Sequence, residues 1–372
     1  MAQKVSDIVD LMNQLAPPEK AMNWDAVGLQ VGSMESIVDT VFVTLDLTPK
    51  SLAEGKRHQS QMIITHHPFL FHPLKHVITD EWNGSIIQDL LKSDISLFSA
   101  HTNMDITWGG LNDWVARKIG LNEITVLDET GMESAYKIVV FIPETYEESL
   151  AKALGDIGAG HIGKYSHCSF RITGTGAFKP LKGSNPSIGR HGKMEYVKEV
   201  RFETIVPENL VDKAIRTMED THPYEEVAYD LIRIDNSGSR YGIGRKGCIS
   251  KAQTPQQMVN RLKKIFGIKK LQWVPGVHSY ISQIAILTGS GASAIKAAAD
   301  AGCHALITGD VKYHDAQEAE SAGIHIFDVS HFDSEKCFIH ITTQYLTQAF
   351  RERNWEIRVI SDEISENPIR IV

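Results

Sequence analysis

The first third of the chain repeats one pattern: a short apolar run rich in β-branched residues ends abruptly in polar side chains, and a helical pattern follows. Strands that alternate with helices in this way indicate an α/β fold with a largely buried sheet. The expected elements are strands at 41–46, 62–65 and 95–100 and helices at 5–15, 51–59, 85–91 and 111–119.

The rest of the chain divides into two parts of different character. A chain of 372 residues is too long for one ordinary hydrophobic core, so several domains are expected. After Glu129 the elements follow the order β-α-β-β-α-β, which is the ferredoxin-like arrangement. Beyond this segment the first pattern resumes. We therefore expect an α/β domain in two halves, 1–129 and 237–372, interrupted by a ferredoxin-like insertion of residues 130–236.

The expected elements of these two parts follow from the same patterns. In the insertion they are strands at 136–142, 167–173, 199–206 and 227–234 and helices at 145–154 and 207–218. In the last part they are strands at 281–288, 305–308 and 324–329, helices at 254–266 and 335–351, and an alanine-rich helix that follows Gly291 and ends at Ala301.

Composition excludes some classes of function. The formal net charge is −8, from 46 acidic and 38 basic residues, which argues against a nucleic-acid binder that neutralises phosphates. No apolar stretch has the length needed to span a bilayer, so a membrane protein is not expected. The first residues lack the basic-then-apolar pattern of a signal peptide. The four cysteines are scattered without C-x-x-C spacing, which predicts reduced thiols and a cytoplasmic location.

Two adjacent histidines end the strand expected at 62–65. His66 and His67 follow an apolar run and precede Pro68, which prevents the strand from continuing. Strand ends carry side chains into clefts, and at such an end the chain turns, so both imidazoles can converge. Histidine nitrogen is a ligand for Zn, Mn, Fe and Co divalent ions.

Further ligand types follow other expected strands. Asp105 lies just past the strand at 95–100, and His331 and Glu335 are spaced i, i+4 after the strand at 324–329, which places them on one helix face. In open α/β sheets, ligands gather beyond the carboxyl ends of the strands. We therefore expect a site for two divalent ions, Zn, Fe or Mn, which lie about 3.5–4 Å apart when a carboxylate such as Glu335 bridges them.

Each part of this set also has a plainer explanation. An adjacent histidine pair is often packed or capping, an aspartate after a strand is often a turn residue, and an H-x-x-x-E pair is usually a helix surface. The combination is the stronger signal, because all three parts follow β-branched strands.

Other polar residues near strand ends are candidates for supporting roles. His101 and His314 each follow a strand and precede an acidic residue. They are candidates either for donors that support the metal ligands or for proton carriers, and as proton carriers they are the expected catalytic residues. Asp46 and Asp310 also end strands and are placed to orient histidines. The segment Gly289-Ser290-Gly291 lies between a strand and a helix, where backbone amides hold phosphate in some proteins, although a tight turn also explains it.

These residues lie in segments that resemble the NIF-three-like family, many members of which carry the name GTP cyclohydrolase I type 2 homolog. Ala26 stands where the family usually has Asn, outside the expected metal ligands. The matching segments are Trp24-Asp25-Ala26-Val27-Gly28-Leu29-Gln30-Val31-Gly32, Thr65-His66-His67-Pro68, His101-Thr102-Asn103-Met104-Asp105, Thr308-Gly309-Asp310 and His331-Phe332-Asp333-Ser334-Glu335.

The resemblance implies two divalent ions held by His66, His67, Asp105, His331 and Glu335, with Glu335 as the bridge. It also implies a homohexameric toroid with the metal sites facing an internal cavity. The insertion resembles the PII/CutA-like module of the longer bacterial members, including Thr221-His222-Pro223-Tyr224-Glu225-Glu226. In the family that module is expected to cap the toroid.

Two functions remain open from the sequence. The first is a metal-dependent hydrolase acting on a small molecule, with a nucleotide among the candidates. The family name implies GTP cyclohydrolase chemistry, which releases formate and forms dihydroneopterin triphosphate, and the site equally permits phosphoester hydrolysis. The second is a non-enzymatic metal-handling or regulatory scaffold whose insertion senses a ligand or partner.

Overall fold

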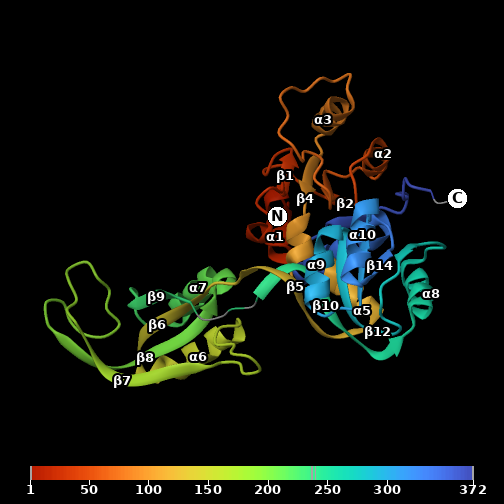
Figure 1. Ribbon diagram of the computed structural model, residues 1–372. Helices are drawn as coiled ribbons and strands as arrows, with labels where there is room; N and C mark the ends of the chain where they lie inside the picture. Colours follow the sequence, from red (N-terminus) through yellow and green to blue (C-terminus); the bar gives the residue numbers. More distant parts are fainter. Residues whose placement is uncertain (1, 236–237, 239, 371–372) are drawn as a thin grey trace. The chain divides into compact units, whose positions relative to one another are not determined.

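The computed structural model describes residues 2–235, 238 and 240–370 (Figure 1). The chain forms two compact units, the first made of Met1–Gly131 and Tyr241–Val372 and the second of Met132–Arg240. The two ends of the sequence therefore build one unit together. The boundary expected at 236 and 237 falls on residues outside the described part.

The first sheet of the first unit has the strand order β1-β4-β3-β2-β15. Its parallel strands β2, β3 and β4 lie where the apolar runs predict them, and Thr44, Thr65 and Ser99 are register partners at their ends. The residues that follow these strands therefore lie at one edge of the sheet. The bounds are β1 Gly28–Val31, β2 Thr40–Thr44, β3 Met62–Thr65, β4 Ser96–Ser99 and β15 Arg358–Ser361.

The second sheet of this unit has the order β11-β14-β13-β12-β10-β5. Strands β12, β13 and β14 are parallel neighbours, and Thr308 and Asp328 are register partners at the ends of the last two. Each sheet includes one strand from the other half of the chain: β15 joins the first sheet and β5 the second. The bounds are β5 Leu121–Met132, β10 Arg240–Gln253, β11 Gln272–Val274, β12 Ile281–Ser290, β13 Ala305–Gly309 and β14 His325–Asp328.

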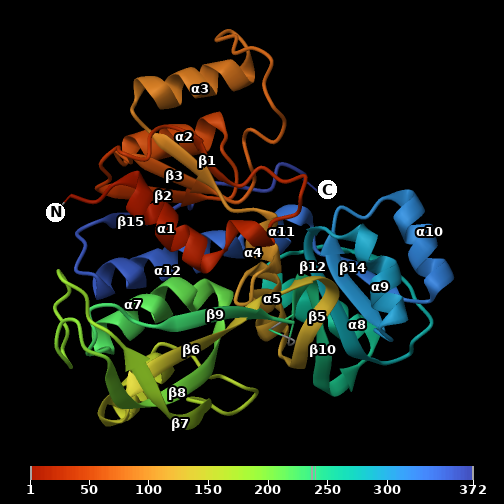
Figure 2. The same cartoon turned by 90° about the vertical axis from the view of Figure 1, so that its left-hand side faces the viewer.

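Helices cover both sheets of the first unit. Helices α2 (Pro49–Arg57) and α3 (Trp82–Lys92) pack on one face of the first sheet, and α9 (Ile295–Asp300) and α10 (Tyr313–Ala322) on one face of the second. A central apolar cluster joins the other faces of both sheets; in Figure 2, α1 and α12 lie on the side of the first sheet opposite α2 and α3. The helices in that cluster are α1 Val5–Leu15, α5 Leu111–Ile119, α8 Pro255–Phe266 and α12 Cys337–Glu352.

Local sequence explains where the central helices begin and end. In α1, Val5, Ile8 and Met12 are fully buried on one face, and the two prolines at 17 and 18 stop the helix because they lack the N–H that would continue it. Helix α8 begins after Thr254, whose side chain accepts the Gln257 N–H, as an N-cap does.

A buried arginine ties the two halves of the first unit together. Arg245 in β10 is 0% exposed, and its Nη2 lies 2.8 Å from Oδ2 of Asp113 in α5. The same guanidinium donates to the carbonyl oxygens of Ile106 and Thr107, at the end of the short helix α4 (Thr102–Ile106). All of its donors are used, so the charge is paired and hydrogen-bonded.

The second unit is a four-stranded antiparallel sheet with two helices. Its elements follow in the order β6, α6, β7, β8, α7, β9, and the strands lie in the order β7-β8-β6-β9. Apolar residues of both helices pack against one face of the sheet and form the core of this unit. The bounds are β6 Ala135–Pro143, α6 Glu147–Asp156, β7 Ser169–Phe178, β8 Glu195–Pro207, α7 Val211–Thr221 and β9 Tyr229–Ile234.

The remaining helices are short. They are α11 His331–Glu335 and the 3-10 helices Pro18–Lys20, Glu144–Tyr146, Glu208–Leu210 and Ala292–Ala294. Within the described ranges, no helix has both the length and the apolar character that crossing a membrane requires.

Candidate metal centre

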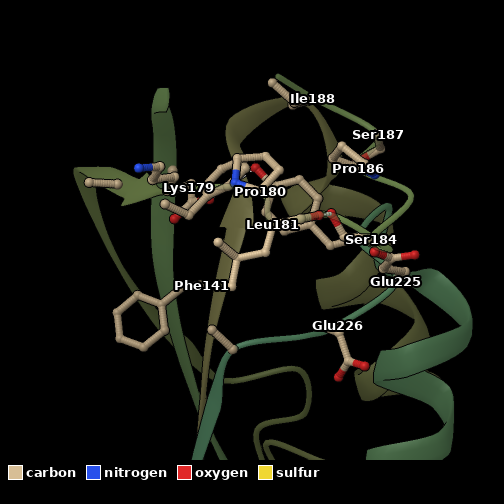
Figure 3. A pocket seen from close by; sticks show the side chains of 15 residues that line it. Phe141, Lys179, Pro180, Leu181, Ser184, Pro186, Ser187, Ile188, Glu225 and Glu226 are labelled. Carbon is tan, nitrogen blue, oxygen red and sulfur yellow. Dashed lines mark hydrogen bonds between the residues drawn. The ribbon is translucent and has the colours of Figure 1, made fainter. Parts of the chain in front are cut away.

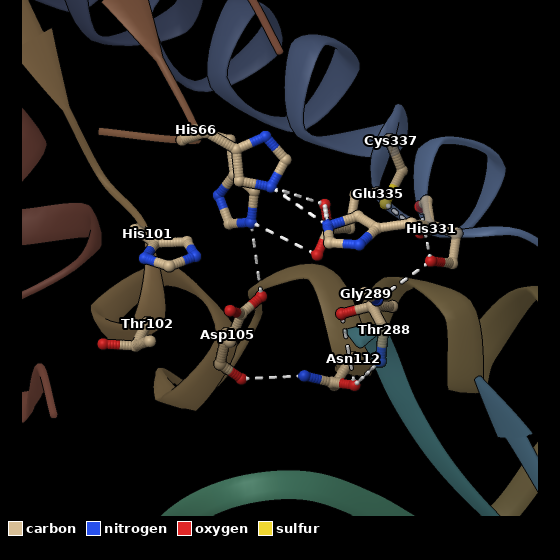
Figure 4. Close-up of polar contacts among 12 residues, drawn as sticks. His66, His101, Thr102, Asp105, Asn112, Thr288, Gly289, His331, Glu335 and Cys337 are labelled. Atoms are coloured by element: carbon tan, nitrogen blue, oxygen red, sulfur yellow. Dashed lines mark hydrogen bonds and ion pairs between the residues drawn. The ribbon is translucent and has the colours of Figure 1, made fainter. Parts of the chain in front are cut away.

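The five expected ligands meet where strands of both sheets of the first unit end. His66 and His67 follow β3, Asp105 lies in α4 after β4, and His331 and Glu335 begin and end α11 after β14. Figure 4 shows His66, Asp105, His331 and Glu335 pointing toward one another from these different elements. The register of the parallel strands explains this, because residues beyond aligned strand ends share one edge of each sheet.

Three atoms of the cluster form a triangle suited to one cation. Nε2 of His67 and Nε2 of His331 are 3.2 Å apart. Oε2 of Glu335 lies 3.0 Å from the first and 2.9 Å from the second. Two nitrogens that each lie about 2.0–2.1 Å from a tetrahedral zinc ion are about 3.3–3.4 Å apart, which is close to the spacing of the two histidines.

A second set of atoms lies on the other side of Glu335. Nε2 of His66 is 3.7 Å from Oδ1 of Asp105 and 3.7 Å from Oε1 of Glu335. The Nε2 of His66 and the Oδ1 of Asp105 are buried and have no hydrogen-bond partner among the described residues. Buried polar atoms without partners are costly, and a cation between them would satisfy both. The donor set therefore fits divalent metal ions.

The three histidines are held with Nε2 turned toward the cluster. In each ring Nδ1 bonds an oxygen acceptor, which leaves the Nε2 lone pair for a cation. These bonds join His66 to the Ala100 carbonyl at 2.8 Å, His67 to Oδ1 of Asp46 at 2.8 Å and His331 to Oδ2 of Asp310 at 2.6 Å.

The electrostatics of the cluster are those of a site that takes up positive charge. Burial alone lowers the pKa of His67, but hydrogen bonds to Asp46 and Glu335 outweigh it and raise the pKa to about 10. Burial, together with the negative charge of Glu335, raises the pKa of Asp105 to about 7. Protons and a metal ion therefore compete for the same atoms.

The carboxylate of Glu335 remains ionised. Burial would raise its pKa, but the charge of His66 and the hydrogen bonds of the neighbouring histidines hold that pKa well below its usual range. In His331, burial lowers the pKa, while the bonds to Glu335 and Asp310 raise it to about 9. A charged carboxylate at the centre is what a bridging ligand requires.

His101 joins the cluster, and His314 does not. The His101 ring lies 5.2 Å from the His66 ring and 5.5 Å from the His67 ring between centroids, and its nitrogen is near enough to theirs to share an ion. His314 is exposed on α10, where its Nδ1 bonds Oε1 of Gln317 at 3.1 Å, and no described contact joins it to the cluster. The residue of this segment that reaches the cluster is Asp310, which directly follows β13 and bonds His331.

Some supporting residues were not predicted from the sequence. The carboxylate of Asp25 accepts hydrogen bonds from Nδ1 of His101 at 2.9 Å and from the N–H of Thr102 at 2.9 Å. Asn112 is fully buried and bonds the Asp105 carbonyl through Nδ2 at 3.1 Å. Asp25 stands in the family-like segment 24–32, which was the one available signal, but nothing in that segment indicates its partner.

The backbone that presents α11 is strained and closely packed. Ser330 precedes His331 with φ 72° and ψ 150°, a region that residues other than glycine rarely adopt. A β-carbon on Gly309 would lie 2.5 Å from the His331 nitrogen, so only glycine permits this approach of β13 to α11. Strain of this kind is commonly found at functional sites.

The glycine-rich segment at the end of β12 is a turn whose amides are already used. The Gly289 N–H donates to Oγ of Ser334 at 2.9 Å, and the Gly291 N–H donates to Oγ1 of Thr308 at 3.0 Å. These amides are therefore satisfied within the protein, which favours the tight-turn explanation over phosphate binding.

A cavity of about 620 Å³ opens beside the cluster. Its volume is in the range of small-molecule sites. Its lining includes His67 and His331 from the cluster, the two aspartates that orient them, and Lys269 and Lys270. The neighbouring thiol of Cys337 is buried, and burial together with the nearby Glu335 and Asp105 raises its pKa.

Comparisons with known proteins match nearly the whole chain to the family that its sequence motifs resemble. A model of the family described as Duf34/NIF3 (NGG1p interacting factor 3) matches residues 3–368. A Bacillus subtilis protein named GTP cyclohydrolase 1 type 2 homolog is 36% identical over 370 residues, 99% of each chain. A Halalkalibacterium halodurans protein of the same name is 36% identical over 365 residues, 98% of each. The crystal structure of a Bacillus cereus protein related to NIF3 covers 100% of both chains with a TM-score of 0.91 and 36% identity.

Proposed function

This chain belongs to the Duf34/NIF3 family, and on that premise we propose that it is a hydrolase with a dinuclear divalent-metal centre. The observation that carries the proposal is the Glu335 carboxylate, whose two oxygens face different sets of ligand atoms. Oε2 lies within 3.0 Å of Nε2 of His67, and Oε1 lies 3.7 Å from Nε2 of His66. A carboxylate in this position would bridge the two ions of such a site.

In this proposal His67, His331 and Glu335 would hold one ion, and His66, Asp105 and Glu335 would hold the other. Divalent ions bound by these residues would supply Lewis-acid activation of water and charge stabilisation. Mixed nitrogen and oxygen ligands suit Zn, Fe and Mn alike.

The protein's own groups then position the substrate and move protons. His101 donates through Nδ1 to Asp25, which fixes the tautomer with the proton on Nδ1. Its Nε2 is therefore placed to accept and release a proton. His314 has no such place, because it lies exposed on α10. The cavity beside the cluster would hold the substrate. Its wall carries Lys269 and Lys270 together with four aspartates, so attraction of phosphate groups would depend on the bound metal ions; the aspartates are Asp46, Asp310, Asp328 and Asp333.

A nucleoside triphosphate is the substrate that we propose. The relatives' name, GTP cyclohydrolase 1 type 2 homolog, points to GTP. We also propose that the second unit is the ferredoxin-like insertion and that the chain assembles as a homohexamer, which sedimentation of the purified protein would test.

Metal content tests the centre itself. Full-length protein is stripped with a chelator, reloaded separately with Zn, Mn and Fe(II), and analysed for bound metal. Two ions per chain are expected for the wild type and for the exposed control Glu366→Gln, and fewer for Glu335→Gln. A wild-type stoichiometry below two with every metal would reject the dinuclear centre.

Formate release from GTP tests the reaction. Metal-loaded wild type should turn over. Compared at equal bound-metal content, because its nitrogen lies near those of His66 and His67, His101→Gln should lose about 10²–10⁴-fold in rate, as expected when a general acid–base group is removed. No formate from fully loaded protein would reject the cyclohydrolase version while leaving the metal centre standing.

A further inference from the structure

A separate cavity of about 430 Å³ lies within the second unit, and none of its lining residues belongs to the metal cluster. Its wall is largely apolar, with rings or aliphatic side chains from Phe141, Phe178, Leu181 and Ile188. In Figure 3, Leu181 lies between Phe141 and the loop that carries Ser184 and Ile188. A volume of this size suits a small organic molecule.

The position of the cavity follows from strand alternation. Ile142 in β6 and Val200 in β8 are directly opposed and belong to the core beneath α6 and α7. Their neighbours Phe141 and Glu199 therefore turn to the other face of the sheet, where they line the cavity. Residues 177–188 cover part of that face.

A buried carboxylate faces this apolar wall. Glu199 is 8% exposed, its Oε1 accepts the Tyr224 hydroxyl at 3.0 Å, and its Oε2 accepts no hydrogen bond among the described residues. A β-carbon on Gly176 would lie 2.0 Å from Oε2, so the glycine leaves the room that the carboxylate occupies. A carboxylate held in apolar surroundings without a cation is costly, which favours a positively charged partner.

The family-like segment at 221–226 builds one side of the cavity. His222 donates through Nε2 to the Phe141 carbonyl at 3.0 Å and accepts the Tyr224 N–H at Nδ1 at 3.1 Å. Burial lowers the pKa of His222, so the ring stays neutral and keeps both bonds. These bonds hold the Tyr224 ring 5.7 Å from the Phe178 ring, so an aromatic pair stands beside the carboxylate.

The charges around the cavity have one predominant sign. The lining residues include three carboxylates, Glu199, Glu225 and Glu226, against the single ammonium of Lys179. Glu225 also fixes the covering loop, because its Oε1 accepts the Asn185 N–H at 2.7 Å. The local field therefore favours a cation.

We propose that this cavity binds a small aromatic cation, an amidine or a protonated amine, whose N–H groups bond Glu199 while its ring packs among Phe141, Phe178 and Tyr224. Charge-assisted hydrogen bonds to the carboxylate supply selectivity, and the three rings supply apolar contact and cation–π attraction. The site does not depend on the metal centre, so the two proposals stand or fall separately.

The test uses full-length protein and benzamidine as the probe. Binding is followed by ligand-observed NMR and titration calorimetry, in parallel with neutral benzamide and anionic benzoate, which share the ring. Benzamidine should bind saturably, and the two isosteres should bind at least about tenfold more weakly, since a hydrogen bond between charged groups is worth that factor or more. No binding of benzamidine, or equal binding of all three, would overturn the proposal.

Variants locate the bound probe. Glu199→Gln should lose at least about tenfold in benzamidine affinity. The matched control is Glu203→Gln, which changes a carboxylate on the same strand that lies outside the cavity and faces Lys137. An unchanged affinity in Glu199→Gln would refute the site.

A second variant decides the matter if Glu199→Gln does not fold. Leu181→Arg changes a side chain that is 69% exposed, so folding is not at risk, and it brings a competing guanidinium to the cavity. Benzamidine binding should disappear in this variant. Unchanged binding there would likewise refute the site.

Discussion

A β-carbon on Gly289 would lie 2.0 Å from Oε1 of Glu335, so the carboxylate occupies the space that a side chain at position 289 would need. Gly289, the last residue but one of β12, has a φ of 72°, a conformation that glycine adopts readily. The end of one strand and the last residue of α11 therefore fit together only because position 289 has no side chain.

Gly289→Ala should weaken metal binding by about 10–100-fold, the range seen when the support of a ligand is disturbed. The new methyl group must displace the Glu335 carboxylate. Calorimetric titration of metal into chelator-stripped protein measures the effect. Gly302→Ala is the matched control, because Gly302 has the same φ of 72° but nothing within 4 Å of its β-carbon position. Equal losses in both variants would mean that backbone strain, not the collision, is responsible.

Asp310→Asn should also lower metal affinity by about 10–100-fold, because His331 then loses the negative partner that orients its ring and raises its basicity. Asparagine keeps the shape and tolerates the left-handed backbone of position 310, where φ is 55°. The control is Asp300→Asn, which changes an exposed aspartate that pairs with Lys296. Wild-type affinity in Asp310→Asn would show that the 2.6 Å bond to His331 has no part in metal binding.

Arg245→Met should destabilise the first unit by about 3–5 kcal/mol, since it leaves the buried charge of Asp113 without its partner. Adding Asp113→Asn should restore part of the loss, because no charge then remains unpaired. Urea denaturation followed by tryptophan fluorescence measures both. Arg57→Met, which removes an exposed pair with Glu54, should change stability by less than about 1 kcal/mol. A double variant as unstable as Arg245→Met alone would contradict this account of the pair.

Removal of metal should lower the melting temperature, and re-addition should restore it. A ligand that binds only the folded state at 100 times its dissociation constant stabilises by about 2.7 kcal/mol. Differential scanning calorimetry with and without chelator measures the shift. His67→Ala, which removes a ligand of one of the two proposed ions, should show a smaller shift than the wild type. An unshifted wild-type transition would argue that no ion is bound under those conditions.

Sequence patterns predicted the elements whose apolar residues are contiguous or periodic. The strand at 62–65 and the helix at 111–119 have the predicted bounds, since each buries a face that the sequence displays. Helix α10 was not predicted, because Ala319 is its one buried residue and no apolar stripe marks it. Strand β15 was not predicted either, since its pairing with β2 depends on residues more than 300 positions earlier.

The same division applies to the site. His66, His67 and Asp105 stand beside strands that the sequence reveals, so their shared edge could be predicted. The role of Asp25 could not, because its bond to His101 spans 76 positions and no local pattern encodes it. The space at Gly289 likewise depends on where Glu335 arrives after folding.

The exchange of β15 and β5 between the two sheets has a consequence for synthesis on the ribosome. Strand β2 pairs with β3, which follows it closely in the sequence, but the partner of its other edge, Arg358–Ser361, is synthesised only near the end of the chain. An open strand edge invites pairing with other chains. The edge of β2 in the nascent N-terminal half therefore stays unpaired until almost the entire polypeptide has been synthesised. Binding of a chaperone to this edge during synthesis would raise the yield of native protein.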